Sequence, residues 1–298
     1  MIYVSIILTV AFVFVLTRLY FLKKEIKRTT VQLHERNHHD SGKKLTLSYY
    51  DKDLERLAQE VNKQIDATRK TKAEQRMTEN ELKQAISHIS HDIRTPMTSI
   101  LGYVQFLESD DLTPEMRKEY TTTVKNGAKR LKVLLEDFFE LSVIEQADYP
   151  VKAEKIKLNQ FVLDVLLGFY EAFNQKNIEP TIDIADTDRT IMADPSAVKR
   201  VIENLLTNAI RHANGQVAIQ LRDEGDFVEL TISNSVDQLS EQDVTHMFNR
   251  FYKADQTRTG NGTGLGLPIA KSLMEKMNGS LTAELKGNEL FMKCKWNT

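Results

Sequence analysis

The hydrophobic pattern opens with one long apolar run. Residues 2–22 are interrupted by only a few polar side chains, and Arg18 is the first charged residue of the chain. A helix of this length reaches about 30 Å, the thickness of the hydrocarbon core of a bilayer. We therefore predict that residues 1–22 form a single transmembrane helix.

Basic residues follow this run directly, at Lys23, Lys24, Lys27 and Arg28. A cleaved signal peptide instead has its basic residues before the apolar run and a small-residue cleavage site after it, so it is a less favoured alternative, as is an interfacial helix. By the positive-inside rule, the basic side stays in the cytoplasm. We expect a single-pass membrane protein with its N-terminus outside, almost no extracellular part, and all other domains cytoplasmic.

Residues 23–80 are polar and contain no proline, which predicts a cytosolic helical linker. A repeat of seven with a polar middle is typical of a coiled coil, with a solvated amphipathic helix as the alternative; the repeat positions are Leu54, Val61, Thr68, Gln75, Leu82 and Ile89. Residues 51–65 resemble the second helix of a HAMP signalling module, although residues 23–47 lack clear heptads. A parallel seam would make the protein a dimer.

Two helical stretches follow within residues 81–148. The first covers residues 81–107, and the second covers residues 114–146 after a turn at residues 109–114 that ends in Pro114. Each helix has one wide apolar stripe, which two antiparallel helices cannot bury alone. We therefore expect a helical-hairpin dimerisation domain that forms a dimeric four-helix bundle.

Residues 150–298 mix strand and helix patterns and predict a two-layer α/β sandwich. Helices are expected at residues 157–176 and 267–277, and after Asp194 and Pro195, which are typical of an N-cap and a first helical position. Strands are expected at residues 178–184, 190–193, 216–222 and 227–233, with two more at the end.

The composition narrows the function classes. The net charge of −2, from 40 basic and 42 acidic residues, favours no nucleic-acid partner. The single cysteine, Cys294, forbids an internal disulfide and matches a reducing compartment. The sequence has no Cys/His metal spacing, and we expect His38 and His39 to lie in a solvated turn.

Three segments carry candidate chemistry. Residues 87–103 place His91 on a helix, followed by Asp92 and then by Thr95 and a proline, in the order H-D-I-R-T-P. Residues 203–213 place Asn204 and Asn208 four apart on one helix face, where amide oxygens suit Mg²⁺; a structural hydrogen-bond network is the alternative.

The third segment, residues 260–279, has alternating glycines just before a helix, so that backbone amides and the helix N-terminus can bind phosphate. These glycines are Gly262, Gly264 and Gly266, and Leu265 lies between the last two. The segment fits neither G-x-G-x-x-G nor a Walker A loop.

These segments resemble the H-box, N-box and G2-box of bacterial sensor histidine kinases, and residues 247–255 resemble the F-box of the same family. The resemblance covers about residues 81–298. It implies a histidine phosphotransfer domain followed by an ATP-binding domain of the Bergerat (GHKL) fold.

The resemblance also implies roles for individual residues. His91 would be the phosphoacceptor, with Asp92 holding its Nδ1–H, and Thr95 would orient water for dephosphorylating a partner regulator. Asn208 would bind Mg²⁺ with support from Asn204 and Glu203. Candidates for compensating phosphate charge are Arg211, Lys253 and Arg258, and His212 stands where the family commonly has a tyrosine.

One box departs from the family pattern. Where relatives have D-x-G-x-G, this chain has Asn234 followed by Ser235, Val236, Asp237 and Gln238. The side-chain oxygen of Asn234 can still accept a hydrogen bond from the adenine amino group, but without charge assistance. We expect weaker or differently shaped adenine binding.

The predicted function is a two-component sensor histidine kinase that uses ATP and Mg²⁺. It would form a homodimer and phosphorylate an aspartate in the receiver domain of a response regulator. The alternatives are a membrane-tethered pseudokinase or adaptor with weak nucleotide binding, and an ATPase of the chaperone or mismatch-repair kind, which the H-box and the anchor disfavour. Signal input is expected from the bilayer or from a membrane partner such as a transporter.

Overall fold

The computed structural model describes residues 2–39, 44–49, 51–109, 111–184, 190–254 and 262–297. It divides into two compact units, residues 1–84 and residues 85–298. The predicted fold class is confirmed: an apolar N-terminal helix, a helical hairpin and a C-terminal α/β domain.

The first unit contains helix α1 (Ile2–His39), residues 44–49 and the first part of helix α2 (Lys52–Leu107). The apolar part of α1 is exposed, as expected of a helix whose surroundings are lipid. His38 and His39 lie in this helix and not in the predicted turn, because the helical pattern continues past the basic cluster.

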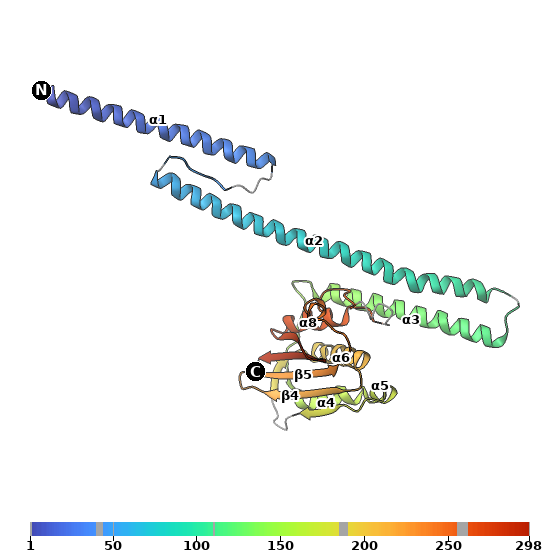
Figure 1. Cartoon of the computed structure of the whole chain (residues 1–298). Helices are drawn as coiled ribbons and strands as arrows, with labels where there is room; N and C mark the ends of the chain where they lie inside the picture. The colour runs from blue at the N-terminus through green and yellow to red at the C-terminus, as the bar shows by residue number, and fades with distance from the viewer. Residues whose placement is uncertain are drawn as a thin grey trace. The chain divides into compact units, whose positions relative to one another are not determined.

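Residues 44–49 lie between α1 and the start of α2, which run in the same direction (Figure 1). The amide of Ser48 donates to the buried carboxylate of Glu25 at 2.8 Å. The backbone of Leu45 exchanges two hydrogen bonds with the side-chain amide of Asn62, at 2.8 and 3.1 Å. These contacts fix the connecting segment against both helices.

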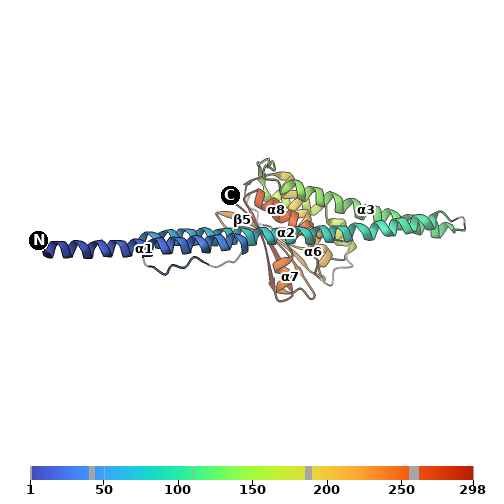
Figure 2. The same cartoon turned by 90° about the horizontal axis from the view of Figure 1, so that it is seen from above.

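The second unit begins with the hairpin of α2 and α3 (Pro114–Ile144). The two helices lie side by side in both views (Figures 1 and 2). Thr113 caps α3 by accepting from the amide of Met116, and Pro114 takes the first helical position as predicted. Gly127 permits close packing, because a Cβ there would lie 2.9 Å from the side chain of Ile100.

The C-terminal domain has a five-stranded sheet in the order β2-β4-β5-β7-β6 and a small sheet of β1 and β3. Among the described strands of the larger sheet, β2 and β4 pair in parallel and the other neighbours pair antiparallel. The strands are β1 (Glu154–Lys157), β2 (Thr181–Ile184), β3 (Thr190–Ala193), β4 (Val217–Asp223), β5 (Phe227–Ser235), β6 (Ser280–Lys286) and β7 (Glu289–Asn297).

Helices pack on one face of the larger sheet: α4 (Leu158–Leu167), α6 (Pro195–His212) and α8 (Gly266–Lys276), with the short helices α5 (Tyr170–Gln175) and α7 (Glu241–His246) beside them. The inward row of β5, including Leu230 and Ile232, and the apolar face of α6 form one core. Outward residues of the sheet are polar and pair with one another, as Lys293 does with Glu284 at 2.6 Å. This is the predicted two-layer arrangement.

Two predicted elements differ from the structure. The helix expected over residues 157–176 is strand β1 followed by α4 and α5, because Gly168, a weak helix former, ends α4 and Lys157 pairs with Thr190 of β3. The strand expected from residue 178 begins only at Thr181, after Pro180, which has no N–H for the ladder.

Candidate active site

His91 lies on the α2 part of the hairpin with its side chain 76% exposed. Its Nδ1 is 3.4 Å from Oδ1 of Asp92, and the hydroxyl of Thr95 donates to the backbone carbonyl of His91 at 3.1 Å. Pro96 lies inside this helix and has no N–H for the carbonyl one turn earlier. The imidazole is thus held on one side and open to a reactant on the other.

The carboxylate of Asp92 is shared between the two domains. Its Oδ2 accepts from Nζ of Lys253 at 2.5 Å, while Oδ1 faces His91. Burial works to raise the pKa of Asp92, but the hydrogen bond and charge of Lys253, with those of His91, outweigh it and leave the pKa lowered. Asp92 is therefore ionised at neutral pH.

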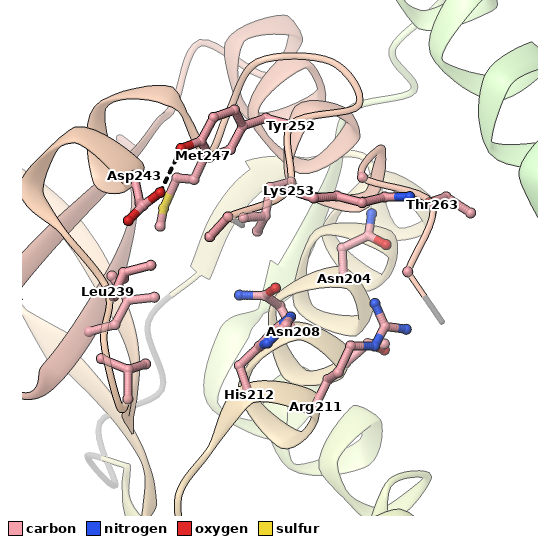
Figure 3. A pocket seen from close by; sticks show the side chains of 18 of the residues that line it. Asn204, Asn208, Arg211, His212, Leu239, Asp243, Met247, Tyr252, Lys253 and Thr263 are labelled. Atoms are coloured by element: carbon pink, nitrogen blue, oxygen red, sulfur yellow. Dashed lines mark hydrogen bonds between the residues drawn. The ribbon is translucent and has the colours of Figure 1, made fainter. Parts of the chain in front are cut away.

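A cavity of about 540 Å³ lies in the C-terminal domain and is large enough for a nucleotide. One wall is the face of α6 that carries Asn204, Asn208, Arg211 and His212, whose side chains point into the cavity (Figure 3). This face forms because these positions follow the helical period. The sequence prediction that the two asparagines share one face is confirmed.

The opposite wall was not predicted from the sequence. Leu239 and Met247 line it together with Asp243, whose Oδ1 accepts from the hydroxyl of Tyr252 at 2.6 Å (Figure 3). Asp243 also accepts from the hydroxyl and amide of Ser240, the N-cap of α7, and its hydrogen bonds with Ser240 and Tyr252 lower its pKa. The capping-box spacing was visible in the sequence, but its position at the cavity was not.

The glycine segment lies against the α6 wall of the cavity. Gly264 has φ +71°, and a Cβ there would come within 2.9 Å of the backbone of Phe251. A Cβ on Gly262 would lie 2.6 Å from Nη1 of Arg211, and one on Gly266 would lie 3.2 Å from Oδ1 of Asn204. The predicted glycines and α6 residues therefore do meet in one place.

Two observations show that the cavity fits a phosphate ligand with a hard cation. Nδ2 of Asn204 is buried and has no hydrogen-bond partner among the described residues. Burial lowers the pKa of Arg211, against the opposing charge of Asp137, so an anion bound beside this desolvated guanidinium would be stabilised by its positive charge. Amide oxygens on α6 and a helix N-terminus at Gly266 match Mg²⁺ and phosphate.

His212 also lines the cavity. Burial, followed by the charges of Arg211 and Lys176, lowers the pKa of its imidazole below the ordinary value of 6.5. The ring is therefore neutral at physiological pH and presents a flat, uncharged surface.

Some predicted site residues lie elsewhere. Glu203 pairs with Lys199 at 3.9 Å and is not among the residues that line the cavity. Leu265 is fully buried in the core at the start of α8. Arg258 lies outside the described residues.

The altered G1 segment forms another part of the wall. Asn234 is buried at the end of β5, where its Nδ2 donates to the carbonyl of Ser235 at 3.1 Å. Val236, Asp237 and Gln238 line the cavity instead. Gln238 has φ +141°, so the second glycine position keeps a glycine-like backbone although its residue is glutamine.

The helical hairpin also contributes to the cavity, which the sequence did not predict. Val133 and Asp137 of α3 line it, and Asp137 accepts from the hydroxyl of Thr263 at 2.7 Å. Asp137 is a buried acid beside the apolar stripe of α3. In the sequence, an acidic residue next to this stripe was the signal that could have pointed to a role for Asp137.

Comparisons with known proteins match this architecture. Residues 81–147 match the family model of the His Kinase A (phospho-acceptor) domain. Residues 193–294 match the model of the histidine kinase-, DNA gyrase B-, and HSP90-like ATPase.

Relatives extend the match across most of the chain. "Sensor histidine kinase YcbM" of Bacillus subtilis is 30% identical over 84% of this chain and 82% of its own length. "Sensor protein VanSC" of Enterococcus gallinarum is 30% identical over 91% of this chain and 75% of its own.

Solved structures share the fold. The Acinetobacter baumannii histidine kinase AdeS superposes with a TM-score of 0.58 at 22% identity, over 70% of this chain and 97% of that one. The histidine kinase ThkA in complex with the response regulator protein TrrA gives a TM-score of 0.62 at 23% identity, over 77% of this chain and 66% of that one.

Proposed function

Because this chain belongs to the bacterial sensor histidine kinases, which phosphorylate themselves and pass the phosphate on, we propose that His91 is its phosphoacceptor. The observation that carries the proposal is the contact of the exposed His91 with Asp92. Asp92 accepts Nδ1–H, which leaves the lone pair on Nε2 free for attack and stabilises the imidazolium.

ATP supplies the phosphoryl group, and a bound Mg²⁺ would offset the negative charge of its phosphates. We propose that Asn208 binds Mg²⁺, with Asn204 and Glu203 in support through direct or water-mediated contacts. Arg211, Lys253 and Arg258 would offset phosphate charge. Backbone groups from Gly262 to Gly266, including Leu265, would bind the phosphates. The segment that follows Asn234, whose Val236, Asp237 and Gln238 line the cavity, would bind the adenine in place of Asn234 itself.

The partners follow from the family. We propose a homodimer that transfers phosphate from His91 to an aspartate in a response-regulator receiver domain. Thr95, one turn after His91, would orient the water that dephosphorylates that regulator. The match to both domain models and to sensor kinases disfavours a pseudokinase.

The chain is membrane-anchored through α1, whose residues 2–34 are long and apolar enough to cross a bilayer. We propose that its N-terminus lies outside and that residues from Lys23 onward are cytoplasmic, with residues 23–80 acting as a HAMP-like linker. A reporter enzyme that is active only outside the cytoplasm should therefore be inactive when it is fused after residue 298. Activity of this fusion would disprove the proposed orientation.

We further propose that the stimulus enters through residues 1–22, from the bilayer or from a membrane protein such as a transporter. Replacing these residues by an unrelated apolar helix should abolish the response to the stimulus while leaving kinase activity intact. A preserved response would refute the proposal.

Labelling of the full chain tests the central assignment. In detergent with γ-labelled ATP and Mg²⁺, the protein should acquire an acid-labile, base-stable label. His91→Gln should abolish it, whereas His88→Gln, an exposed histidine one turn earlier on the same helix, should not. Retention of label by His91→Gln would exclude His91 as the acceptor.

A further inference from the structure

The ATP-binding domain contacts the helical hairpin of its own chain through charged and polar side chains. Besides Lys253 with Asp92, Arg200 donates to Asp137 at 2.7 Å and to Glu140 at 2.6 Å. Further contacts join Thr263 to Asp137, Arg250 to Glu145 and Lys276 to the carbonyl of Gln146. The contacts therefore involve both α2 and α3.

Several of these contacts belong to the cavity itself. Lys253 and Thr263 line it from the ATP-binding domain, and Asp137 lines it from α3. The hairpin of the same chain is thus part of the cavity wall.

His91, Asp92 and Lys253 form a continuous series that leads from the hairpin to the cavity. Asp92 uses one oxygen for His91 and the other for Lys253. The side chains of Asp92 and Lys253 are only 19% and 16% exposed, whereas His91 is 76% exposed. The pair of Asp92 and Lys253 is thus shielded from water, which strengthens the electrostatic attraction between the two groups. The imidazole of His91 stays accessible.

We propose that His91 is phosphorylated from the nucleotide cavity of its own chain, and that Lys253 is the positioning residue that joins the cavity to Asp92. This inference rests on the proposed kinase function. In the step, a bond forms between Nε2 of His91 and the γ-phosphorus, and the bond from that phosphorus to the bridging oxygen breaks. ADP leaves with the electron pair, and the proton on Nδ1 remains held by Asp92.

Transfer to the partner's histidine would require the domain to leave its own hairpin. That movement would break the largely shielded ion pairs of Lys253 with Asp92 and of Arg200 with Asp137, and the more exposed pair of Arg250 with Glu145. The shielded charge-assisted hydrogen bonds are stronger than they would be in water, so losing them costs free energy. The geometry therefore favours transfer within one chain.

Mixed dimers of the full chain distinguish the two routes. His91→Gln lacks the acceptor and Asn208→Ala lacks the proposed Mg²⁺ ligand, so neither homodimer should label. Co-expressed with different affinity tags and purified through both, the mixed dimer should label no more than either parent. A mixed dimer that labels on the Asn208→Ala chain would overturn the proposal.

The control is a mixed dimer of wild type and His91→Gln, which should retain label on the wild-type chain. If the wild-type protein itself acquires no label, the proposed kinase function is wrong, and the experiment does not bear on whether transfer occurs within one chain. The two failures are therefore distinguishable.

A cross-link tests the contact without activity. With Lys253→Cys and Asp92→Cys in one chain, a short bismaleimide should join the two thiols within that chain, and the product should keep the monomer mass on a denaturing gel. Each single variant should give no such product. A product of doubled mass, or none from a chain that melts like wild type, would overturn the proposal.

The role of Lys253 is tested by separating binding from transfer. Lys253→Ala should lower the labelling rate by about 10- to 100-fold at saturating ATP, because Asp92 and His91 lose alignment. Although Lys253 is a candidate for offsetting phosphate charge, affinity for a fluorescent ATP analogue should fall by less than about threefold, because most of its charge is already paired with Asp92. Lys253→Arg should restore much of the rate, and Lys286→Ala, at the exposed end of β6, should change neither.

A rate loss matched by an equal loss of nucleotide affinity would assign Lys253 to phosphate binding instead. An unchanged labelling rate in Lys253→Ala would show that Lys253 has no role in the reaction.

Discussion

Two glycines of the ATP-binding domain share a left-handed backbone but differ in their surroundings. Gly264 has φ +71° and lies against the backbone of Phe251 and Tyr252, whereas Gly225 has φ +84° and has nothing within 4 Å of an added Cβ. Both would be strained by a side chain, by about 1–2 kcal/mol. Only Gly264 would also displace the cavity wall.

Gly264→Ala should therefore weaken binding of a fluorescent ATP analogue by at least about tenfold, because the glycine segment must move away from Phe251. Gly225→Ala, in the turn between β4 and β5, should lower stability by a similar backbone term but leave nucleotide affinity unchanged. Titration and thermal unfolding of both variants measure the two effects. Equal affinities in the two variants would show that the close approach at Gly264 is not needed for binding.

At the scale of elements, α6 is the helix that presents most of the site. Its N-cap, Asp194, accepts from the amides of Ser196 and Ala197, at 2.9 and 3.2 Å. The other carboxylate oxygen accepts from the amide of Lys152 at 2.9 Å. This hydrogen bond links the first residues of the domain to the start of α6. The spacing of Asn204 and Asn208 then follows from the helix that this cap begins.

Asp194→Ala should lower the free energy of unfolding of the ATP-binding domain by about 1–2 kcal/mol, because three amide donors lose their acceptor. Asp194→Asn keeps one acceptor oxygen and should lose less than half as much. Denaturant unfolding of the two variants provides the comparison. If asparagine and alanine are equally destabilising, the cap is not the source of the effect.

At the scale of the whole molecule, the hairpin leaves large apolar side chains uncovered in a single chain. Leu101 is 58% exposed and Phe139 is 63% exposed, and Met97, Phe106 and Val143 are exposed as well. An exposed apolar surface of this kind marks an interface. The covering partner that fits is the hairpin of a second copy, as in the four-helix bundle predicted from the sequence.

Leu101→Glu should convert the dimer to a monomer, because the carboxylate would be buried without a partner in the bundle. Lys118→Glu, an exposed polar position on α3, should leave the dimer intact. Light scattering of the detergent-solubilised full chain measures the mass of each variant. A dimeric Leu101→Glu would place the dimer interface elsewhere.

Much of the fold and part of the site were predictable because their signals are local. The apolar run, the helix that begins at Asp194 and Pro195, and the shared face of Asn204 and Asn208 each depend on neighbours within one element. The helix predicted across Gly168 was wrong for a related reason: one weak helix former outweighed an otherwise continuous pattern.

The sequence by itself determined the membrane helix, the hairpin, the α/β layers, and His91 with its neighbouring acid. Only the tertiary structure decided that Lys253 reaches Asp92, 161 positions away, that Asp137 of the hairpin lines the cavity, and that Asp243 and Tyr252 form its far wall. The physical reason is that a periodic pattern encodes which face of an element is buried, but not which element from elsewhere in the chain packs against that face.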